Sequence, residues 1–248
     1  MSSTDSFRAI HFDIITLFPE MFDGPFRESI LDRARQEGRL NVRLHHLRDY
    51  TLNKHGKVDD TPFGGGAGLV MNIEPIDRAL QAVKKDRPGA WTVLLSPSGK
   101  KFDQKKAREL SEKTEIVLIC GRYEGIDERV AQTLVDEDLS IGDFVLSGGE
   151  IAAMAVVDAV ARLVPGVVGD PASLEEESFE NGLLEYPQYT RPRDYAGLEV
   201  PEVLVSGDHK KIRAWQRQAA LKKTARNRPD LMADIPLTPE ERELLKDS

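Results

Sequence analysis

The sequence contains a single cysteine, Cys120, and no apolar run of eighteen or more residues. One thiol forms neither an intrachain disulfide nor a cysteine zinc cluster, which predicts a chain that works in the reducing cytoplasm. The missing apolar run excludes a membrane-spanning helix, and the polar residues 1–8 lack the apolar core of a secretory signal. No group of histidine, cysteine, aspartate and glutamate has the spacing of a metal site, so no metal ligands are predicted.

Positive charge is also scarce, because 34 lysines and arginines stand against 42 aspartates and glutamates, a formal net charge of −8. Overall attraction to nucleic acid is therefore not expected. Residues 209–228 are the exception, since they include eight lysines and arginines and no acid. Such a segment is either a solvated helix face or a local surface that neutralises phosphates.

Short β-branched segments alternate with amphipathic ones through the first two thirds of the chain. This alternation predicts an α/β fold around a mainly parallel sheet. The expected strands are 11–18, 40–47, 91–95, 115–120 and 144–146, and the expected helices are 25–37, 76–84, 104–113, 126–134 and 150–164. Residues 48–68 between them are expected to be irregular.

The pattern changes after Gly169. Residues 170–181 are acidic and aperiodic, which is typical of a linker. The proline-rich stretch that follows is expected to be irregular up to Leu204, before a basic helix over 208–225 and a final helix with a cap at Thr238. We therefore predict an α/β domain over 1–168, a flexible linker over 169–182 and a small helical domain over 183–248.

Three of the expected strands end in loops rich in glycine, serine or proline, at 96–99, 121–125 and 147–149. Ligands of open α/β sheets bind beyond the carboxyl ends of strands, so these loops are expected to converge on one pocket. The middle loop carries an arginine, a tyrosine and a glutamate, which favours a functional site; an ion-paired turn is the alternative.

A further glycine-rich segment covers residues 64–68. It lacks the lysine and the serine or threonine of a phosphate-binding loop, and its context does not fit a dinucleotide fingerprint. On its own it is best interpreted as a flexible turn. The serine nucleophile elbow of the hydrolases is absent from the sequence.

Seven sequence blocks nevertheless match one family in order. They are LFPEMF (17–22), VDDTPFGGGAG (58–68), LICGRYEG (118–125), SIGD (140–143), LSGGE (146–150), YPQYTRP (186–192), and VPEVL (200–204), the last followed by SGDH. The sequence thus resembles the bacterial tRNA (guanine-N1)-methyltransferases over nearly its whole length. The resemblance implies a SPOUT-class α/β domain with a deep trefoil knot, a helical domain, and a homodimer with two active sites at the interface.

The resemblance also implies the ligands and the residues that bind them. The methyl donor would be S-adenosylmethionine, in a pocket lined by Leu95, Ser96, Pro97, Gly121, Tyr123, Glu124, Ser140, Ile141, Gly142, Leu146, Gly148 and Gly149. The acceptor would be the guanosine immediately 3′ of the anticodon in tRNA, preceded by another guanosine, and magnesium is a candidate cofactor. The RNA contacts would come from Asp60, Lys210, Lys211, Arg213 and Arg217.

Chemistry at guanine N1 requires a base, because this nitrogen carries a proton at neutral pH. Negative charge moves toward O6 as the proton leaves, and a fixed cation should stabilise it. The resemblance implies a linker carboxylate as the base and Arg162 as the cation, with Glu124 completing the catalytic set. The family has Asp-Ser-Phe at the base position, whereas this chain has Glu177-Ser178-Phe179, so Glu177 is the predicted base.

Two other functions are compatible with the same sequence. One is a methyltransferase of the same fold that acts on a ribose hydroxyl or on another base, which mass analysis of the modified nucleoside distinguishes. The other is a non-enzymatic RNA-binding protein, suggested only by the glutamate at position 177, which failure to bind S-adenosylmethionine would favour.

Overall fold

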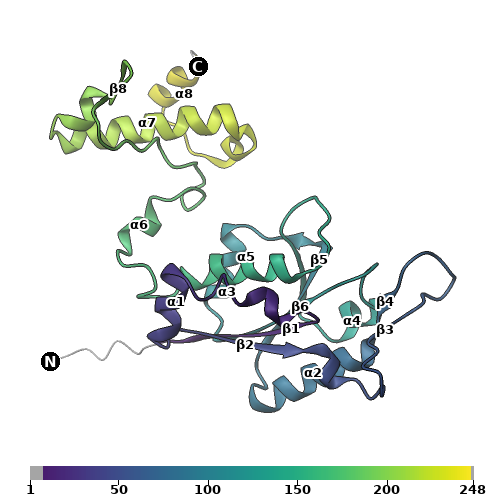
Figure 1. The fold of residues 1–248 in the computed structure, drawn as a ribbon. Helices are drawn as coiled ribbons and strands as arrows, with labels where there is room; N and C mark the ends of the chain where they lie inside the picture. Colours follow the sequence, from purple (N-terminus) through teal and green to yellow (C-terminus); the bar gives the residue numbers. More distant parts are fainter. Residues whose placement is uncertain (1–7, 247–248) are drawn as a thin grey trace. The chain divides into compact units, whose positions relative to one another are not determined.

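The computed structural model describes residues 8–246, apart from one side chain at position 172. The polar start of the chain, for which no secretory signal is predicted, falls largely outside this range. The chain forms two compact units, divided between Gly169 and Asp170 (Figure 1). No helix within residues 8–246 is both long and apolar enough to cross a membrane.

The first unit is built on a five-stranded parallel sheet, which confirms the predicted α/β class. Its strands are β1 (Ile10–Thr16), β2 (Leu40–His46), β5 (Trp91–Lys101), β6 (Glu115–Cys120) and β7 (Glu137–Ser140), in the order β2-β1-β6-β5-β7. The unit's other elements are η1 (Pro19–Phe22), α1 (Ser29–Gln36), η2 (Leu47–Tyr50), β3 (Asp59–Asp60), β4 (Val70–Met71), α2 (Ile73–Asp86), α3 (Gln104–Ser111), α4 (Glu128–Thr133) and α5 (Glu150–Ala161).

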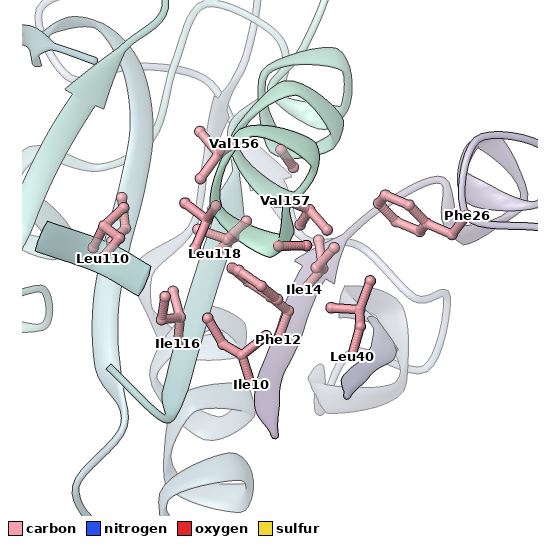
Figure 2. Close-up of a cluster of buried hydrophobic side chains, with 14 of the residues drawn as sticks. Ile10, Phe12, Ile14, Phe26, Leu40, Leu110, Ile116, Leu118, Val156 and Val157 are labelled. Carbon is pink, nitrogen blue, oxygen red and sulfur yellow. The ribbon is translucent and has the colours of Figure 1, made fainter. Parts of the chain in front are cut away.

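Both faces of the sheet are covered, as expected for parallel strands joined by helices. Alternate residues of each strand point to opposite faces. On one face Phe12 and Leu118 pack under α5, beside Val156 and Val157 (Figure 2). On the other face the buried residues include Ile15, Val117 and Ile119, which cluster with Ile76 and Leu80 of α2. The strands are apolar on both faces because each face packs against its own hydrophobic core.

One predicted strand is wrong. Residues 144–146 form no strand; Phe144 is 52% and Val145 85% exposed. The strand at this edge of the sheet is β7, in which Leu139 is fully buried and pairs with Leu95 of β5. The three apolar residues that suggested a strand lie in the turn that leads into α5.

Strands β5 and β7 approach each other unusually closely. The register between them shifts after Leu95, so that Lys100 also pairs with Leu139. A Cβ atom built on Gly99 would lie 2.5 Å from the backbone nitrogen of Leu139 and 2.6 Å from the carbonyl carbon of Asp138. Only glycine fits at position 99, because real Cβ atoms do not come that near to backbone.

The second unit contains α6 (Ala172–Glu175), β8 (Asp194–Tyr195), β9 (Leu198–Glu199), η3 (Glu202–Val205), α7 (His209–Asn227), η4 (Pro229–Asp234) and α8 (Pro239–Lys246). Its buried core is small and centres on Leu183, Ala220 and Leu221. The stretch before Leu204 is less irregular than expected, because it includes the β8–β9 hairpin and η3. The predicted cap of α8 is confirmed, since the Glu241 amide donates to Thr238 Oγ1 over 3.2 Å.

A buried polar network lies outside the two apolar cores. The Asp13 carboxylate is 1% exposed and accepts hydrogen bonds from His45 Nε2, over 2.6 Å, and from the Arg87 guanidinium. His45 Nδ1 lies 2.8 Å from the hydroxyl of Tyr50. Burial alone would raise the pKa of Asp13, but the hydrogen bonds and charges of His45 and Arg87 outweigh it, and the pKa is lowered.

We expect Asp13→Asn to lower the free energy of unfolding by about 2 kcal/mol at pH 7, because the variant removes the buried carboxylate beside Arg87 and leaves only Glu115, at 3.6 Å, to pair with its charge. A carboxyl whose pKa falls on folding stabilises the protein above its unfolded pKa of about 3.9, and this contribution is lost as the pH drops toward the folded value. Urea unfolding at pH 7, 5 and 3 should show the difference between the variant and the wild type shrinking below about pH 4.

Asp23→Asn is the matched control, because Asp23 is paired with Arg27 at an exposed site. This control should unfold at the wild-type urea concentration. An Asp13→Asn protein as stable as the wild type at pH 7 would show that the network contributes nothing.

Candidate active site

A cleft of about 440 Å³ lies where the ends of β5, β6 and β7 meet. Its size is in the range of small-molecule sites. Its walls are residues 94, 96–98, 121–128, 131, 138–142, 144–146, 148, 149 and 152. Residues from all three predicted loop segments line this one cleft, but 96–99 is not a loop after a strand: it is part of β5, beside the register shift that follows Leu95.

Eleven of the twelve residues predicted to bind the methyl donor line the cleft. The exception is Leu95, whose side chain belongs to the core under α5, while Leu94, which belongs to the core on the other face, is among the lining residues. Strand alternation explains the difference, because neighbouring side chains point to opposite faces of the sheet. The backbone of Leu95 still borders the site, since its carbonyl oxygen lies 3.7 Å from a Cβ built on Gly121.

Two of the loops are interlocked through backbone atoms. The Gly149 amide donates to the Gly121 carbonyl over 2.9 Å, and Arg122 forms an antiparallel bridge with Gly148. A Cβ atom on Gly149 would lie 2.8 Å from the Cα of Cys120. Glycine is thus required at position 149 because the neighbouring chain leaves no room for a side chain, whether or not a ligand is bound.

A buried ion pair connects the same two loops. The Arg122 Nε donates to Glu150 over 2.9 Å, and the hydroxyl of Thr16 donates to the other oxygen of Glu150 over 2.8 Å. Glu150 is fully buried, and Arg122 also donates to the Ser147 carbonyl over 3.1 Å. The Arg122 guanidinium is thus held in an ion pair, and Arg122, Tyr123 and Glu124 of this loop all line the cleft.

The single thiol is not a nucleophile in this site. Cys120 is buried below the cleft, and burial, reinforced by the charge of Glu150, raises the pKa of its thiol well above the usual value. A thiol that stays protonated behaves as a small apolar core residue.

The last glycine of segment 64–68 lies against Glu124, a residue of the cleft wall. Gly64, Gly65, Gly66 and Gly68 all have positive φ, a backbone conformation that suits glycine. A Cβ atom on Gly68 would lie 2.3 Å from the Cγ atom of Glu124. This contact could not be predicted from the glycines alone, because it depends on how the β3–β4 hairpin packs.

Asp138 is a cleft residue that the sequence analysis missed, because it did not predict the strand β7. Burial, and next the charge of Glu128, raises the pKa of Asp138 above its ordinary value. Carboxyl groups with shifted pKa values in a cleft are candidates for ligand binding. The only feature of the sequence that could have indicated Asp138 is its position next to Leu139, because neighbouring residues of a strand point to opposite faces of the sheet.

The two predicted catalytic residues of the first unit, Glu124 and Arg162, do not lie together. Glu124 lines the cleft, but Arg162 caps the carboxyl end of α5 and is not part of the cleft wall. The twelve residues of α5 separate it from Glu150 by about 18 Å of helix rise. Glu177 belongs to the second unit, in a turn where the Phe179 amide donates to the Leu183 carbonyl over 2.7 Å.

The predicted RNA-binding residues differ in their ion pairing within the chain. Lys210 and Arg213 are exposed on α7, whereas Lys211 pairs with Asp208 at 3.3 Å and Arg217 pairs with Glu241 at 2.9 Å. Asp60, in the first unit, is exposed and pairs with Lys57 at 2.9 Å, and this hydrogen bond lowers the pKa of its carboxyl.

The fold and the cleft define an α/β enzyme class with its ligand site at the carboxyl edge of a parallel sheet. The model of the tRNA (guanine-1)-methyltransferase TrmD family matches residues 10–234, and the chain belongs to this family. It is similar to the tRNA (guanine-N(1)-)-methyltransferases of Dictyoglomus turgidum (56% identity, 96% of each chain) and Carboxydothermus hydrogenoformans (57%, 94% of this chain and 91% of the relative). The solved tRNA (m1G37) methyltransferase from Aquifex aeolicus has a TM-score of 0.74 and 41% identity, over 90% of this chain and 95% of that one.

Proposed function

We propose that this protein transfers a methyl group from S-adenosylmethionine to N1 of the guanosine immediately 3′ of the anticodon in tRNA, giving 1-methylguanosine. Membership of the family and the relatives' shared activity support this proposal. The observation that carries it is the cleft, in which three segments predicted to hold one ligand converge. An enzyme that modifies tRNA is expected to work in the cytoplasm, and this location is part of the proposal.

The cleft fits the proposed donor. Its glycines leave backbone amides and carbonyls accessible to the polar edges of an adenosine, and the apolar Leu94, Ile126 and Phe144 offer contacts for a ring. Phe144 packs over Gly142, where a Cβ would lie 2.5 Å from its ring. The close chain passages at Gly99 and Gly149 support the knotted path that the family resemblance implies.

S-adenosylmethionine supplies a methyl group on a positively charged sulfonium, which is a good leaving group. Glu177 takes the proton from guanine N1, and the methyl carbon bonds to N1 as its bond to sulfur breaks. Arg162 stabilises the charge that reaches O6. The carboxylate of Glu124, in the cleft wall, attracts the cationic donor. The proposed reaction uses no magnesium ligand from this chain.

A homodimer accounts for the separation of Arg162 from the cleft, because a second copy can supply a group that is remote within one chain. An exposed apolar patch beside the cleft supports this arrangement. Phe18 and Met21 are exposed by 42% and 38%, and both contact the Arg122 guanidinium. Ile151, next to Glu150, is 49% exposed. Large exposed apolar patches mark interaction surfaces.

The test incubates the purified protein with S-adenosylmethionine labelled in the methyl group and with two unmodified tRNA transcripts. One transcript has guanosine 3′ of the anticodon and the other has adenosine. Label recovered as 1-methylguanosine from the first transcript alone is the expected result. Label on a ribose or on another base would support the related methyltransferase instead, and a protein that binds no S-adenosylmethionine would support the non-enzymatic alternative.

The basic surface of α7 should contribute to tRNA affinity. We expect the double variant Lys210→Glu and Arg213→Glu to weaken binding about tenfold or more at 0.1 M salt, because each lysine or arginine on a phosphate releases counterions. Fluorescence anisotropy with labelled tRNA over 50–300 mM KCl should also give a shallower salt dependence, by about one unit of slope per lost contact.

The control for this variant reverses Lys84 and Lys85, which lie in the last turn of α2 in the first unit. Its tRNA affinity should stay within about twofold of the wild type. Equal affinity of the α7 variant and this control would leave α7 as a solvated helix face.

A further inference from the structure

The loop between β3 and β4 presents an aromatic ring wholly to solvent. Phe63 is 103% exposed, the largest value among the exposed large hydrophobic side chains of residues 8–246. A single exposed apolar side chain is common and needs no special explanation. What distinguishes Phe63 is the place where its loop is attached.

The base of this loop is part of the rim of the cleft. The Glu124 amide donates to the Leu69 carbonyl over 3.0 Å, and the Met71 amide donates to the Gly125 carbonyl over 2.9 Å. Glu124 and Gly125 both line the cleft. Phe63 precedes Leu69 by six residues, so its backbone lies within about 20 Å of that rim even for a fully extended chain.

The shape of the loop is set by its backbone rather than by packing. Gly64 and Gly65 have φ values of 86° and 79°, and a Cβ atom on either would meet nothing within 4 Å. Glycine is therefore required there for left-handed turns, not for space. On the other side of Phe63, the Thr61 amide donates to the Asp60 carboxylate over 2.9 Å. The Gly65 amide donates to the Pro62 carbonyl over 3.3 Å, so Phe63 lies within a hydrogen-bonded turn that leads into the left-handed glycines.

We propose that Phe63 stacks on an unpaired nucleobase next to the guanosine that is methylated, and occupies the space left in the base stack when this guanosine enters the cleft. The inference rests on the proposed function. Guanine N1 cannot reach a donor inside a cleft while its base remains stacked in the anticodon loop, so the base must leave the stack. An exposed aromatic ring restores stacking to the neighbour that is left behind.

The experiment uses a tRNA transcript with 2-aminopurine in place of the target guanosine, since the fluorescence of 2-aminopurine rises when the base unstacks. With S-adenosylhomocysteine present, the wild-type protein should raise the fluorescence and Phe63→Ala should produce less than a third of that rise. On the normal transcript, the single-turnover methylation rate of Phe63→Ala should fall about 10- to 100-fold, with S-adenosylmethionine affinity within twofold of the wild type.

Three further variants make the test specific. Phe63→Tyr keeps a ring and should retain the wild-type rate and fluorescence, whereas Phe63→Leu keeps only an apolar side chain and should resemble Phe63→Ala. Leu52→Ala removes another exposed apolar side chain, 79% exposed and outside the β3–β4 loop, and should change neither signal. A leucine variant with the wild-type rate, or an alanine variant with the full fluorescence rise, overturns the proposal.

Contact between copies of the chain is the alternative role for the ring, and sedimentation velocity of Phe63→Ala separates the two roles. An unchanged oligomeric state together with slow methylation supports stacking on RNA, and a shifted oligomeric state overturns it. A wild-type protein that methylates no tRNA defeats the proposed function itself. An active wild type beside an equally active Phe63→Ala defeats only the inference about Phe63.

Discussion

Replacing Glu177 with alanine is expected to slow methyl transfer by about 10²- to 10⁴-fold, the range that a positioned general base contributes. The reason is chemical, since guanine N1 holds its proton at neutral pH and is a poor nucleophile until the proton leaves. Single-turnover methylation of a tRNA transcript measures this step apart from product release. The affinity for S-adenosylmethionine should not change, because Glu177 lies outside the unit that contains the cleft.

Two controls show whether the carboxylate itself is responsible. Glu177→Asp restores the family's residue at this position and should keep the rate within about tenfold of the wild type, although a displacement of about 1 Å can matter. Glu175→Ala removes an exposed carboxylate two residues away and should have little effect. A Glu177→Ala enzyme with wild-type single-turnover rates at pH 7 would rule out Glu177 as the base.

Replacing Glu150 with alanine is expected to lower the free energy of unfolding by about 3–5 kcal/mol, the range for breaking a buried ion pair. The variant leaves the Arg122 guanidinium without its carboxylate and the Thr16 hydroxyl without its acceptor. Since Arg122 joins the loops at 121–125 and 147–149, S-adenosylmethionine should also bind at least about tenfold more weakly. Denaturant unfolding and isothermal titration calorimetry measure the two effects.

Glu74 provides the control, because it occupies the first turn of α2 in the same unit but is exposed. Glu74→Ala should change stability by no more than about 0.5 kcal/mol. If Glu150→Ala unfolds at the wild-type denaturant concentration, the ion pair is not what holds the two loops together.

The periodicity of the sequence was sufficient for strands that are buried on both faces. The predicted strand 115–120 coincides with β6, in the middle of the sheet, because every position from 116 to 120 is buried. It failed at β7, an edge strand that pairs only with β5 and buries a single leucine among acidic residues. Residues 144–146 led to the wrong prediction of a strand, because their apolar side chains lie beside the cleft and are not buried in a sheet.

One rule, that loops after parallel strands share an edge of the sheet, predicted segments of the cleft wall, although only 121–125 directly follows a strand as expected. The rule could not assign the contacts between those loops. Arg122 and Glu150 are 28 residues apart, and only the folded chain brings them to 2.9 Å. The contact between segment 64–68 and Glu124 likewise depends on how the β3–β4 hairpin packs. The glycines predict a backbone with positive φ, but they do not predict which residue the segment will contact.

The contacts at Gly99 and Gly149 limit how this enzyme can evolve. Any larger residue at either position would collide with main chain, which cannot move aside as a side chain can. An inhibitor designed to rest against these two segments would therefore face a surface that point mutation cannot readily reshape. Resistance would have to arise at neighbours with side chains to exchange, such as Ile126 or Phe144.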